Sequence, residues 1–427
     1  MTKLNVTIIG LLFFLQGLYP VMAKEVKPTL LVYGSNIEAF AAAIQAARSN
    51  VPTLWVCDEA SYLEDLSSRA LSVTSNVDLL GGVWKDLMIE TGQIKAKDDS
   101  TVAAFQRDVN PRLLRNALER MVSKQKNLTL VVGVKIFNLS KGKKELNVTL
   151  SNKRKYAVRA MVDASSNAES RKFLVTTDLF AKPSRILAVS EMTDEQRRTL
   201  VAIGEYDGVV YGYTWGNLFA RNVSNVFYVN SLVQVGLDDN SLPLRANLGQ
   251  AIGASAAYCS FFKTDAEKVD VRKLQMELFA FDSRVLPFSD ITSADDNYRC
   301  LQKIFLVSLL SLKKDGDKLV FGGEVPVPLN EVKDVFNRLY SRSQLWFVDN
   351  GSKEYFELKD LLTLIKYVSF RGDEVDREVA KEWSKKLKFE GVYDPSHLVN
   401  RYEFAVLVDR YADPYVKAVN AEGKILR

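Results

Sequence analysis

The chain has 427 residues, of which 47% are hydrophobic and 26% are charged; this composition fits a globular protein with two or three cores and excludes a disordered or fibrous one. The formal charge of +5 comes from 57 basic and 52 acidic residues spread along the chain, so the charge does not indicate a nucleic-acid partner. One histidine and three widely separated cysteines argue against a metal site, zinc catalysis and a Ser-His-Asp triad.

The N-terminus has the features of a signal peptide. Lys3 precedes an apolar run over residues 6–18, Pro20 breaks the run, and residues 21–23 supply the small side chains that a signal peptidase reads. The run is too short to be a convincing membrane span, and no later segment has the length and apolarity to cross a bilayer. We therefore predict a signal peptide over residues 1–23, export to the periplasm or the extracellular space, and no membrane-spanning segment.

The mature chain begins with a strand, a turn and a helix. Residues 29–33 form a short apolar run typical of a buried parallel strand, Gly34 opens a turn, and an Ala-rich segment through Ala47 predicts a helix that packs closely on a sheet. A second apolar run, residues 53–57, is followed by Asp58, about where dinucleotide-binding folds place the carboxylate that bonds a ribose hydroxyl. This order predicts an α/β fold with a Rossmann-like parallel sheet of the FAD/NAD(P)-binding type.

The turn departs from the dinucleotide fingerprint Gly-x-Gly-x-x-Gly at two positions. In that fingerprint the second glycine lets the backbone approach a pyrophosphate and the third lets the helix pack on the strand. Here these places hold Asn36 and Ala39, and the Asn36 side chain lies where a phosphate needs to come close. The sequence therefore supports the fold better than the cofactor.

The middle of the chain predicts further strands and helices. Asn110 and Pro111 start a helix through Lys124, and Gly81 and Gly82 are interpreted as a turn rather than a ligand-binding loop. A small antiparallel insert is predicted to return to the main sheet, with strands at residues 128–134, 135–139, 146–150 and 156–163. Residues 204–215 are then expected in a sheet, residues 225–230 in a buried strand and residues 248–262 in a helix.

Three separated segments resemble one family. Residues 32–39 with Asp58, residues 163–167 and residues 245–257 are similar to the motifs of FAD-dependent oxidoreductases of the glutathione-reductase fold type, especially the exported bacterial group labelled xanthan-lyase-like. The resemblance covers roughly residues 28–285 and implies FAD as cofactor. Its implied contacts are the backbone from Gly34 through Ser35 and Asn36 to Ile37 at the diphosphate and Asp58 at the adenosine ribose, with the remaining cofactor-site residues being Asp163, Arg245, Gly249 and Gln250.

Two functions follow from this resemblance. The first is an exported FAD-dependent oxidoreductase, for which family analogy alone suggests a small-molecule or carbohydrate substrate. The alternative is a non-catalytic descendant that has lost FAD and binds a glycan or a protein. Gly249 and Gly253 fit both, because they serve either a flavin site or close helix packing. No general base and no oligomeric state is predicted, and the polar candidates in the insert are Arg107, Asp108, Arg112, Tyr211, Tyr213 and Trp215.

From about Val269 the sequence predicts helices separated by polar loops. Three segments, at residues 331–336, 357–362 and 403–408, each place a glutamate in a first helical turn before apolar residues at helical spacing. They form either a self-packed appendage or a degenerate repeat used for binding. Residues 400–407 resemble one S-layer-homology motif. The expected division is residues 24–285 for the nucleotide-type domain with its β-rich insert and residues 286–427 for the helical region.

Overall fold

The computed structural model describes residues 27–60, 62–95, 98–174, 186–218, 225–230 and 232–426. The predicted signal peptide, residues 1–23, lies outside the described residues.

A five-stranded parallel sheet forms the centre of the N-terminal half. Its strand order is β11-β7-β1-β2-β3, and every neighbouring pair is parallel. Four of its strands are buried along their whole length, as expected for a sheet covered on both faces. The predicted α/β fold is therefore confirmed, with strands β1 (Leu30–Tyr33), β2 (Thr53–Val56), β3 (Leu128–Val131), β7 (Ala160–Asp163) and β11 (Val226–Tyr228).

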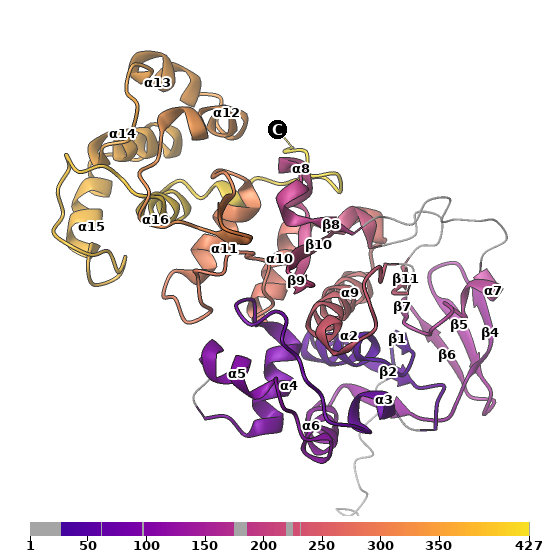
Figure 1. Ribbon diagram of the computed structural model, residues 1–427. Coiled ribbons are helices and arrows are strands. Elements are labelled where there is room, and N and C mark those ends of the chain that lie inside the picture. Colours follow the sequence, from indigo (N-terminus) through magenta and orange to yellow (C-terminus); the bar gives the residue numbers. More distant parts are fainter. Residues whose placement is uncertain are drawn as a thin grey trace, which may run out of the picture.

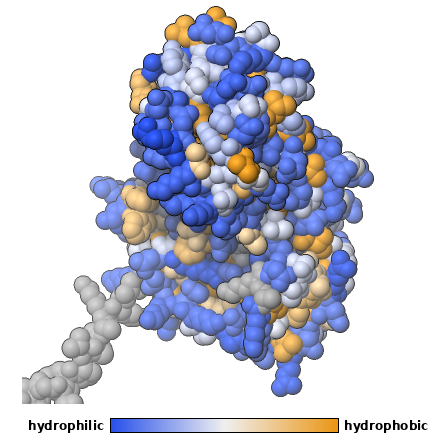
Figure 2. Space-filling model, turned by 90° about the vertical axis from the view of Figure 1, so that its left-hand side faces the viewer, coloured by the Kyte–Doolittle hydropathy of each residue, from blue (hydrophilic) through white to orange (hydrophobic). Residues whose placement is uncertain are grey.

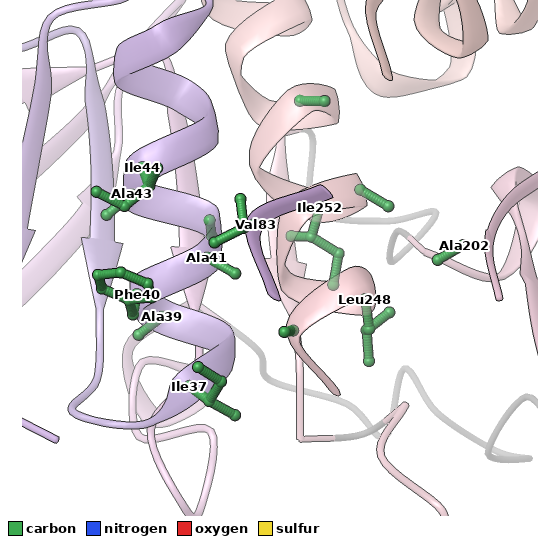
Figure 3. Packing of buried hydrophobic residues seen from close by; sticks show 14 of the residues in the cluster. Ile37, Ala39, Phe40, Ala41, Ala43, Ile44, Val83, Ala202, Leu248 and Ile252 are labelled. Carbon is green, nitrogen blue, oxygen red and sulfur yellow. The ribbon is translucent and has the colours of Figure 1, made fainter. Parts of the chain in front are cut away.

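Two helices lie together against this sheet, α2 (Ile37–Arg48) and α9 (Leu242–Phe262). In Figure 3 the side chains of Ile37 and Ala41 on α2 lie toward α9. A Cβ added to Gly249 would come within 2.4 Å of the Glu38 carbonyl oxygen, and one added to Gly253 would come equally close to the Ala42 carbonyl oxygen. Both glycines are thus required by the close approach of the two helices, which is the packing explanation that the sequence left open.

Shorter helices cover the rest of this half. Asn110 caps α6 by accepting hydrogen bonds from the backbone N–H groups of Arg112 and Leu113, as its position before Pro111 predicts. Gly81 and Gly82, predicted as a turn, instead form the start of α4. These helices are α3 (Glu64–Ser67), α4 (Gly82–Gly92), α5 (Asp99–Phe105), α6 (Pro111–Ser123), α7 (Arg171–Leu174) and α8 (Asp194–Arg198).

Two small antiparallel sheets accompany the parallel one. The first has the order β4-β5-β6, with β4 (Ile136–Lys141), β5 (Leu146–Leu150) and β6 (Lys155–Val158). The second has the order β8-β10-β9, with β8 (Leu187–Ala188), β9 (Leu200–Tyr206) and β10 (Val209–Thr214). The prediction that residues 128–134 belong to the antiparallel insert is wrong, because β3 follows the crossover helix α6 and pairs parallel to β2.

The C-terminal part is helical, as predicted, and Figure 1 shows most of its helices gathered at one end of the molecule. Its helices enclose a separate hydrophobic core that also includes Leu200 and Ile203 of β9. A short hairpin, β12 (Lys313–Asp315) and β13 (Lys318–Val320), interrupts the helices. The helices are α10 (Val271–Ala280), α11 (Tyr298–Val307), α12 (Leu329–Leu339), α13 (Ser343–Asn350), α14 (Leu358–Ser369), α15 (Glu374–Glu382) and α16 (Arg401–Tyr411).

Three extended segments in this part are joined in a closed ring of backbone hydrogen bonds. Residues 325–329, 354–358 and 397–401 lead into α12, α14 and α16. Each segment donates two N–H groups, one to each of the other two segments. The inner bonds run from Val327 to Val399 (3.0 Å), from Val399 to Phe356 (2.9 Å) and from Phe356 to Val327 (3.2 Å). The outer bonds run from Leu329 to Glu354 (3.0 Å), from Leu358 to His397 (3.0 Å) and from Arg401 to Val325 (2.9 Å). We call these six bonds the closing ring.

The closing ring defines which positions in the three segments are equivalent. The inner bonds make Val327, Phe356 and Val399 equivalent. Glu331, Asp360 and Glu403 follow these three residues at the same distance and are therefore equivalent to each other. The sequence pattern aligns Glu357 with Glu331 and Glu403, which is three positions too early. The chain therefore has three similar units related by pseudo-threefold symmetry, and their correct alignment follows from the ring and not from the glutamates.

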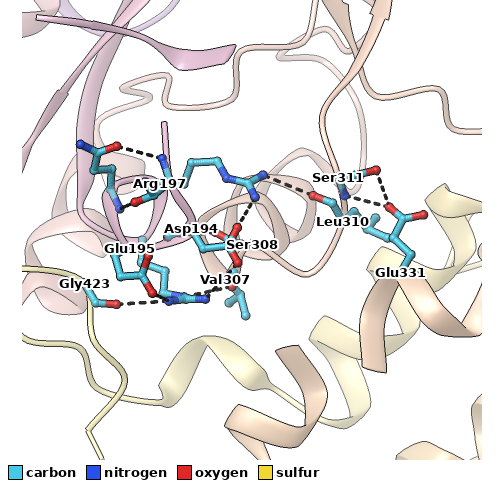
Figure 4. Close-up of polar contacts among 12 residues, drawn as sticks. Asp194, Glu195, Arg197, Val307, Ser308, Leu310, Ser311, Glu331 and Gly423 are labelled. Carbon is cyan, nitrogen blue, oxygen red and sulfur yellow. Dashed lines mark hydrogen bonds and ion pairs between the residues drawn. The ribbon is translucent and has the colours of Figure 1, made fainter. Parts of the chain in front are cut away.

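Polar contacts attach the helical part to α8. Arg197 on α8 donates to the Leu310 carbonyl oxygen (3.3 Å), and Arg198 donates to the Val307 and Gly423 carbonyl oxygens (both 3.4 Å; Figure 4). Figure 2 shows a face of the molecule on which apolar residues form small separate groups among polar ones. Among the helices of the described residues, none combines the length and the apolarity needed to cross a bilayer.

Candidate functional site at the sheet end

A pocket of about 330 Å³ lies at the carboxyl ends of β1, β2, β7 and β11. It sits at the point where the strand order reverses around β1, which is where ligands bind in open α/β sheets. We call it the sheet-end pocket. Its lining comes from the loops after these strands and from the start of α9: Ser35, Asn36, Ile37, Asp58, Glu59, Leu63, Leu66, Arg69, Leu71, Ala164, Ser165, Ser166, Asn230, Leu237, Asp239, Leu242 and Arg245.

Gly34 is needed by the backbone at the base of this pocket. Its φ of +136° lies outside the range that other residues readily adopt, and an added Cβ would come within 2.8 Å of the Ala164 carbonyl carbon. Its carbonyl oxygen accepts a hydrogen bond from Trp55 Nε1 at 2.9 Å. The fold therefore explains Gly34 without a cofactor.

Asn36 caps α2 with its own side chain. Asn36 Oδ1 accepts the Ala39 N–H at 3.0 Å, and Asn36 Nδ2 donates to the Ala164 carbonyl oxygen at 2.8 Å. The N-terminus of this helix is where a dinucleotide places its pyrophosphate in proteins that carry the full fingerprint. In this chain the asparagine amide takes that position and ties the β1–α2 turn to the loop after β7.

Ser35, Ile37 and Asp58, for which the family resemblance implies cofactor contacts, line the pocket. Ser35 Oγ donates to Asp58 Oδ1 at 2.9 Å, so the first turn and the end of β2 are joined by a hydrogen bond. Asp58 and Glu59 place two carboxylates at this side of the pocket. The carboxylate expected for a ribose contact is therefore present.

A buried ion pair crosses the pocket floor. Arg245 donates from Nε to Glu38 Oε1 at 2.6 Å and from Nη2 to Glu38 Oε2 at 2.9 Å, and the Glu38 side chain is 0% exposed. Such a bidentate pair is strong and geometrically specific, and leaving either partner alone in this position is costly. Glu38 is not among the site residues predicted from the sequence, although an acidic residue on a helix of mostly small and apolar residues is a signal for it.

Tyr213 lies close to this ion pair. Burial and the nearby Glu38 carboxylate raise the pKa of Tyr213 well above its usual value, so its hydroxyl stays protonated. Tyr213 is 3% exposed and is not part of the pocket lining.

The other polar candidates predicted from the sequence also lie outside the pocket. Arg107, Asp108 and Arg112 are exposed around the start of α6, and none of these three lines the pocket. Tyr211 on β10 and the buried Trp215 are also outside the lining.

Asp163, Gly249 and Gln250 lie outside the pocket lining. Asp163 is buried and accepts hydrogen bonds from the backbone N–H groups of Ser165 (3.0 Å) and Ser170 (2.8 Å) and from both hydroxyls. Burial raises its pKa more than these bonds lower it. Gln250 accepts the Val83 N–H at 2.9 Å, so it joins α9 to α4. All three therefore have structural contacts in the fold.

Both arginines of the pocket form ion pairs with carboxylates. Arg69 pairs with both carboxylate oxygens of Asp239, and Arg245 pairs with Glu38. Asp239 precedes the start of α9, so a carboxylate already stands beside that helix N-terminus. Asp58 and Glu59 add further negative charge. The lining also contains five leucines, Leu63, Leu66, Leu71, Leu237 and Leu242.

The pocket residues do not fit FAD. A diphosphate needs free backbone N–H groups and cations, but Asn36 occupies the α2 N-terminus and both arginines of the pocket are paired with carboxylates. The volume of about 330 Å³ is also at the small end of the roughly 300–1,000 Å³ typical of drug-sized ligands, and FAD is larger than most of these. In the described part of the chain, no group of three His, Cys, Asp or Glu side chains is arranged to hold a metal ion.

Residues 29–170 match the family model described as FAD dependent oxidoreductase. A bacillithiol disulfide reductase from Staphylococcus aureus aligns with 15% identity and a TM-score of 0.24 over 33% of this chain and 38% of its own. A tetracycline destructase aligns with 12% identity and a TM-score of 0.25 over 36% of this chain and 42% of its own. A thioredoxin reductase from T. acidophilum aligns with 11% identity and a TM-score of 0.21 over 32% of this chain and 35% of its own.

This chain therefore spans less than half the length of each of these solved proteins. No curated protein sequence matches the chain. The resemblance expected from the sequence is confirmed: over residues 29–170 this chain matches the FAD dependent oxidoreductase family.

Proposed function

We propose that the protein is an exported, non-catalytic relative of FAD-dependent oxidoreductases that has lost the flavin and binds a glycan or a protein partner. The observation that carries this proposal is the pair of hydrogen bonds made by Asn36, to the Ala39 N–H and to the Ala164 carbonyl oxygen. They close the pyrophosphate position with the chain's own side chain. The paired arginines and the small pocket volume support the same conclusion.

Export is part of the proposal because residues 1–23 have the composition of a signal peptide. The mature protein would then begin at Lys24, which N-terminal sequencing of the secreted chain checks. Recovery of the intact N-terminus from the cytosol would contradict it.

The second candidate function is an exported FAD-dependent oxidoreductase that acts on a carbohydrate. The family match over residues 29–170 favours it, and the carboxylate of Asp58 stands where a ribose contact is expected. The carbohydrate substrate rests on analogy with the family and on nothing in the pocket.

Titration of FAD into the purified protein decides between the two. We expect no flavin absorbance after purification and no quenching of FAD fluorescence at micromolar protein, because the diphosphate meets Asn36 and paired arginines. The double variant Asn36→Gly with Ala39→Gly restores the fingerprint, and Ala43→Gly on the same helix is the control for the cost of about 1 kcal/mol that a helical glycine brings. Stoichiometric, tight FAD binding by the unmodified protein would overturn the proposal in favour of the second candidate.

A further inference from the structure

The chain's sole histidine lies in the third segment of the closing ring. The His397 carbonyl oxygen accepts the Leu358 N–H at 3.0 Å, so the residue takes part in the ring through its backbone. Its imidazole packs edge-on against Trp383, with ring centroids 5.4 Å apart and an interplanar angle of 80°. The side chain is 26% exposed and is held between the loop before α16 and the first turn of that helix.

Both imidazole nitrogens face acceptors. His397 Nδ1 is 2.6 Å from the Asp394 carbonyl oxygen, and Nε2 is 2.9 Å from Glu403 Oε2. A carbonyl oxygen can only accept, and the same Glu403 oxygen also accepts the Asn400 N–H at 3.2 Å. A neutral imidazole has one N–H and satisfies one of the two contacts. The imidazolium has two and satisfies both.

The contact with Glu403 is also part of the cap of α16. Asn400 Oδ1 accepts the Glu403 N–H at 2.8 Å while the Glu403 carboxylate accepts the Asn400 N–H, which is a complete capping box. His397 adds a third bond to this box. The loop from Asp394 to the helix start is therefore held by a group whose donor count changes near neutral pH.

The charged groups around His397 are on three elements. Asp394 belongs to its own loop and Glu403 to α16, and both carboxylates favour the charged ring. Lys359 at the start of α14 faces Asp394 and pairs with Glu357 at 2.5 Å, so it reduces the negative field around the histidine. Trp383, which follows α15, contributes an uncharged ring.

We propose that His397 is a pH-dependent clamp, which in its doubly protonated form joins the Asp394 loop to the capping box of α16 and thereby holds the third segment of the closing ring. Loss of one proton removes one of the two ring-nitrogen bonds. The first and second segments have no histidine, so only the third is sensitive in this way.

The pH at which the clamp loses its effect depends on how the surroundings shift the pKa of His397. Burial lowers the pKa of His397, but the hydrogen bonds to Glu403 and Asp394 and their charges together outweigh it and raise the pKa above its ordinary value of about 6.5. Because the pKa of His397 is higher in the folded state, the clamp stabilises the folded protein fully at a pH below the pKa of His397 in the unfolded chain. Its contribution is lost as the pH rises through the folded-state value.

The single histidine gives an unambiguous measurement by proton NMR. We expect the imidazole Cε1–H signal of the folded full-length protein to titrate at a higher pH than the same signal in urea-unfolded chain. Glu403→Gln removes the charged acceptor and should move the folded midpoint toward the unfolded one. A folded midpoint at or below the unfolded midpoint would overturn the proposal.

Hydrogen exchange supplies a second readout that needs no variant. Leu358 N–H bonds to the His397 carbonyl oxygen, and Leu329 N–H makes the equivalent bond to Glu354 in a segment without histidine. Between pH 5.5 and 8 the protection factor of the Leu358 amide should fall relative to that of the Leu329 amide. An unchanged ratio would contradict the clamp, because intrinsic exchange chemistry affects both amides alike.

Discussion

Distant parts of the chain are held together in two different ways in the two halves of this protein. At the sheet-end pocket the bonds are made by particular side chains, Asn36 to the loop after β7 and Glu38 to Arg245 on α9. In the closing ring all six bonds join backbone N–H and carbonyl groups. A bond between side chains depends on two residue identities, whereas a backbone bond tolerates almost any residue except proline.

This difference predicts how each half responds to substitutions. A pocket closed by side chains can be opened or closed by single substitutions while the sheet beneath it stays intact. A ring closed by the backbone keeps its geometry even when its three segments share little sequence. The N-terminal half matches the family model over residues 29–170, while Asn36 stands where the dinucleotide fingerprint has its second glycine.

The largest expected loss of stability comes from breaking the ion pair between Glu38 and Arg245. Arg245→Met leaves the Glu38 carboxylate buried without a cation, and we expect a loss of about 3–5 kcal/mol in the free energy of unfolding, measured with urea. The double variant Glu38→Leu with Arg245→Met should recover most of this loss, because no charge is then left unpaired. Arg120→Met is the matched control, since its pair with Glu90 is partly exposed and should cost less than about 1 kcal/mol. Equal losses in the two single variants would show that burial of the pair has no special weight.

An intermediate loss of stability is expected from removing one backbone bond of the closing ring. Val399→Pro removes the N–H that bonds to the Phe356 carbonyl oxygen, and an acceptor left unsatisfied in a buried place costs about 1–3 kcal/mol. Val399→Ile keeps the N–H and adds one methylene to a buried side chain, so any loss, at most about 1–3 kcal/mol of overpacking, contains no contribution from a lost ring bond. If the isoleucine variant is as unstable as the proline variant, the ring depends on side-chain shape and the contrast between the two halves fails.

The smallest effect is expected at Asn36. Asn36→Ala removes the helix cap and the bond to Ala164, which should lower the free energy of unfolding by about 1 kcal/mol. Asn36→Gly should cost only a few tenths of a kcal/mol of cap energy, because glycine is tolerated at this position. A loss above roughly 3 kcal/mol for Asn36→Ala would mean that this residue supports the fold itself and does more than cap α2.

Much of the fold could be predicted because its signals are local. The buried runs of β1 and β2, the Ala-rich α2 and the Asn110 cap of α6 each follow from neighbouring residues. The assignment of residues 128–131 failed because whether a strand pairs locally or across a helix is decided by the whole sheet.

The site was harder to predict than the fold. Six residues for which the family resemblance implies cofactor contacts lie at one edge of the sheet: Gly34, Ser35, Asn36, Ile37, Asp58 and Arg245. The partner of Arg245 could not be identified from the sequence, because Glu38 is 207 positions away and its place on a buried helix shows only that it needs a partner. From the sequence, Gly249 and Gly253 fit either a flavin site or close helix packing. The short distance from both glycines to the α2 backbone shows that packing requires them.

The closing ring also has a consequence for how the protein is made. Four of its six bonds involve residues 397–401, so a growing chain that ends before this segment can form only the two bonds between the first and second segments. Formation of the ring must also bring together residues as far apart as Val325 and Arg401, which is a slow, non-local step. During synthesis, the surfaces of α12 and α14 that pack against α16 therefore stay uncovered until residues 397–401 and α16 have been translated. Until then these apolar surfaces are open to contacts with other chains, which favours aggregation of the incomplete protein.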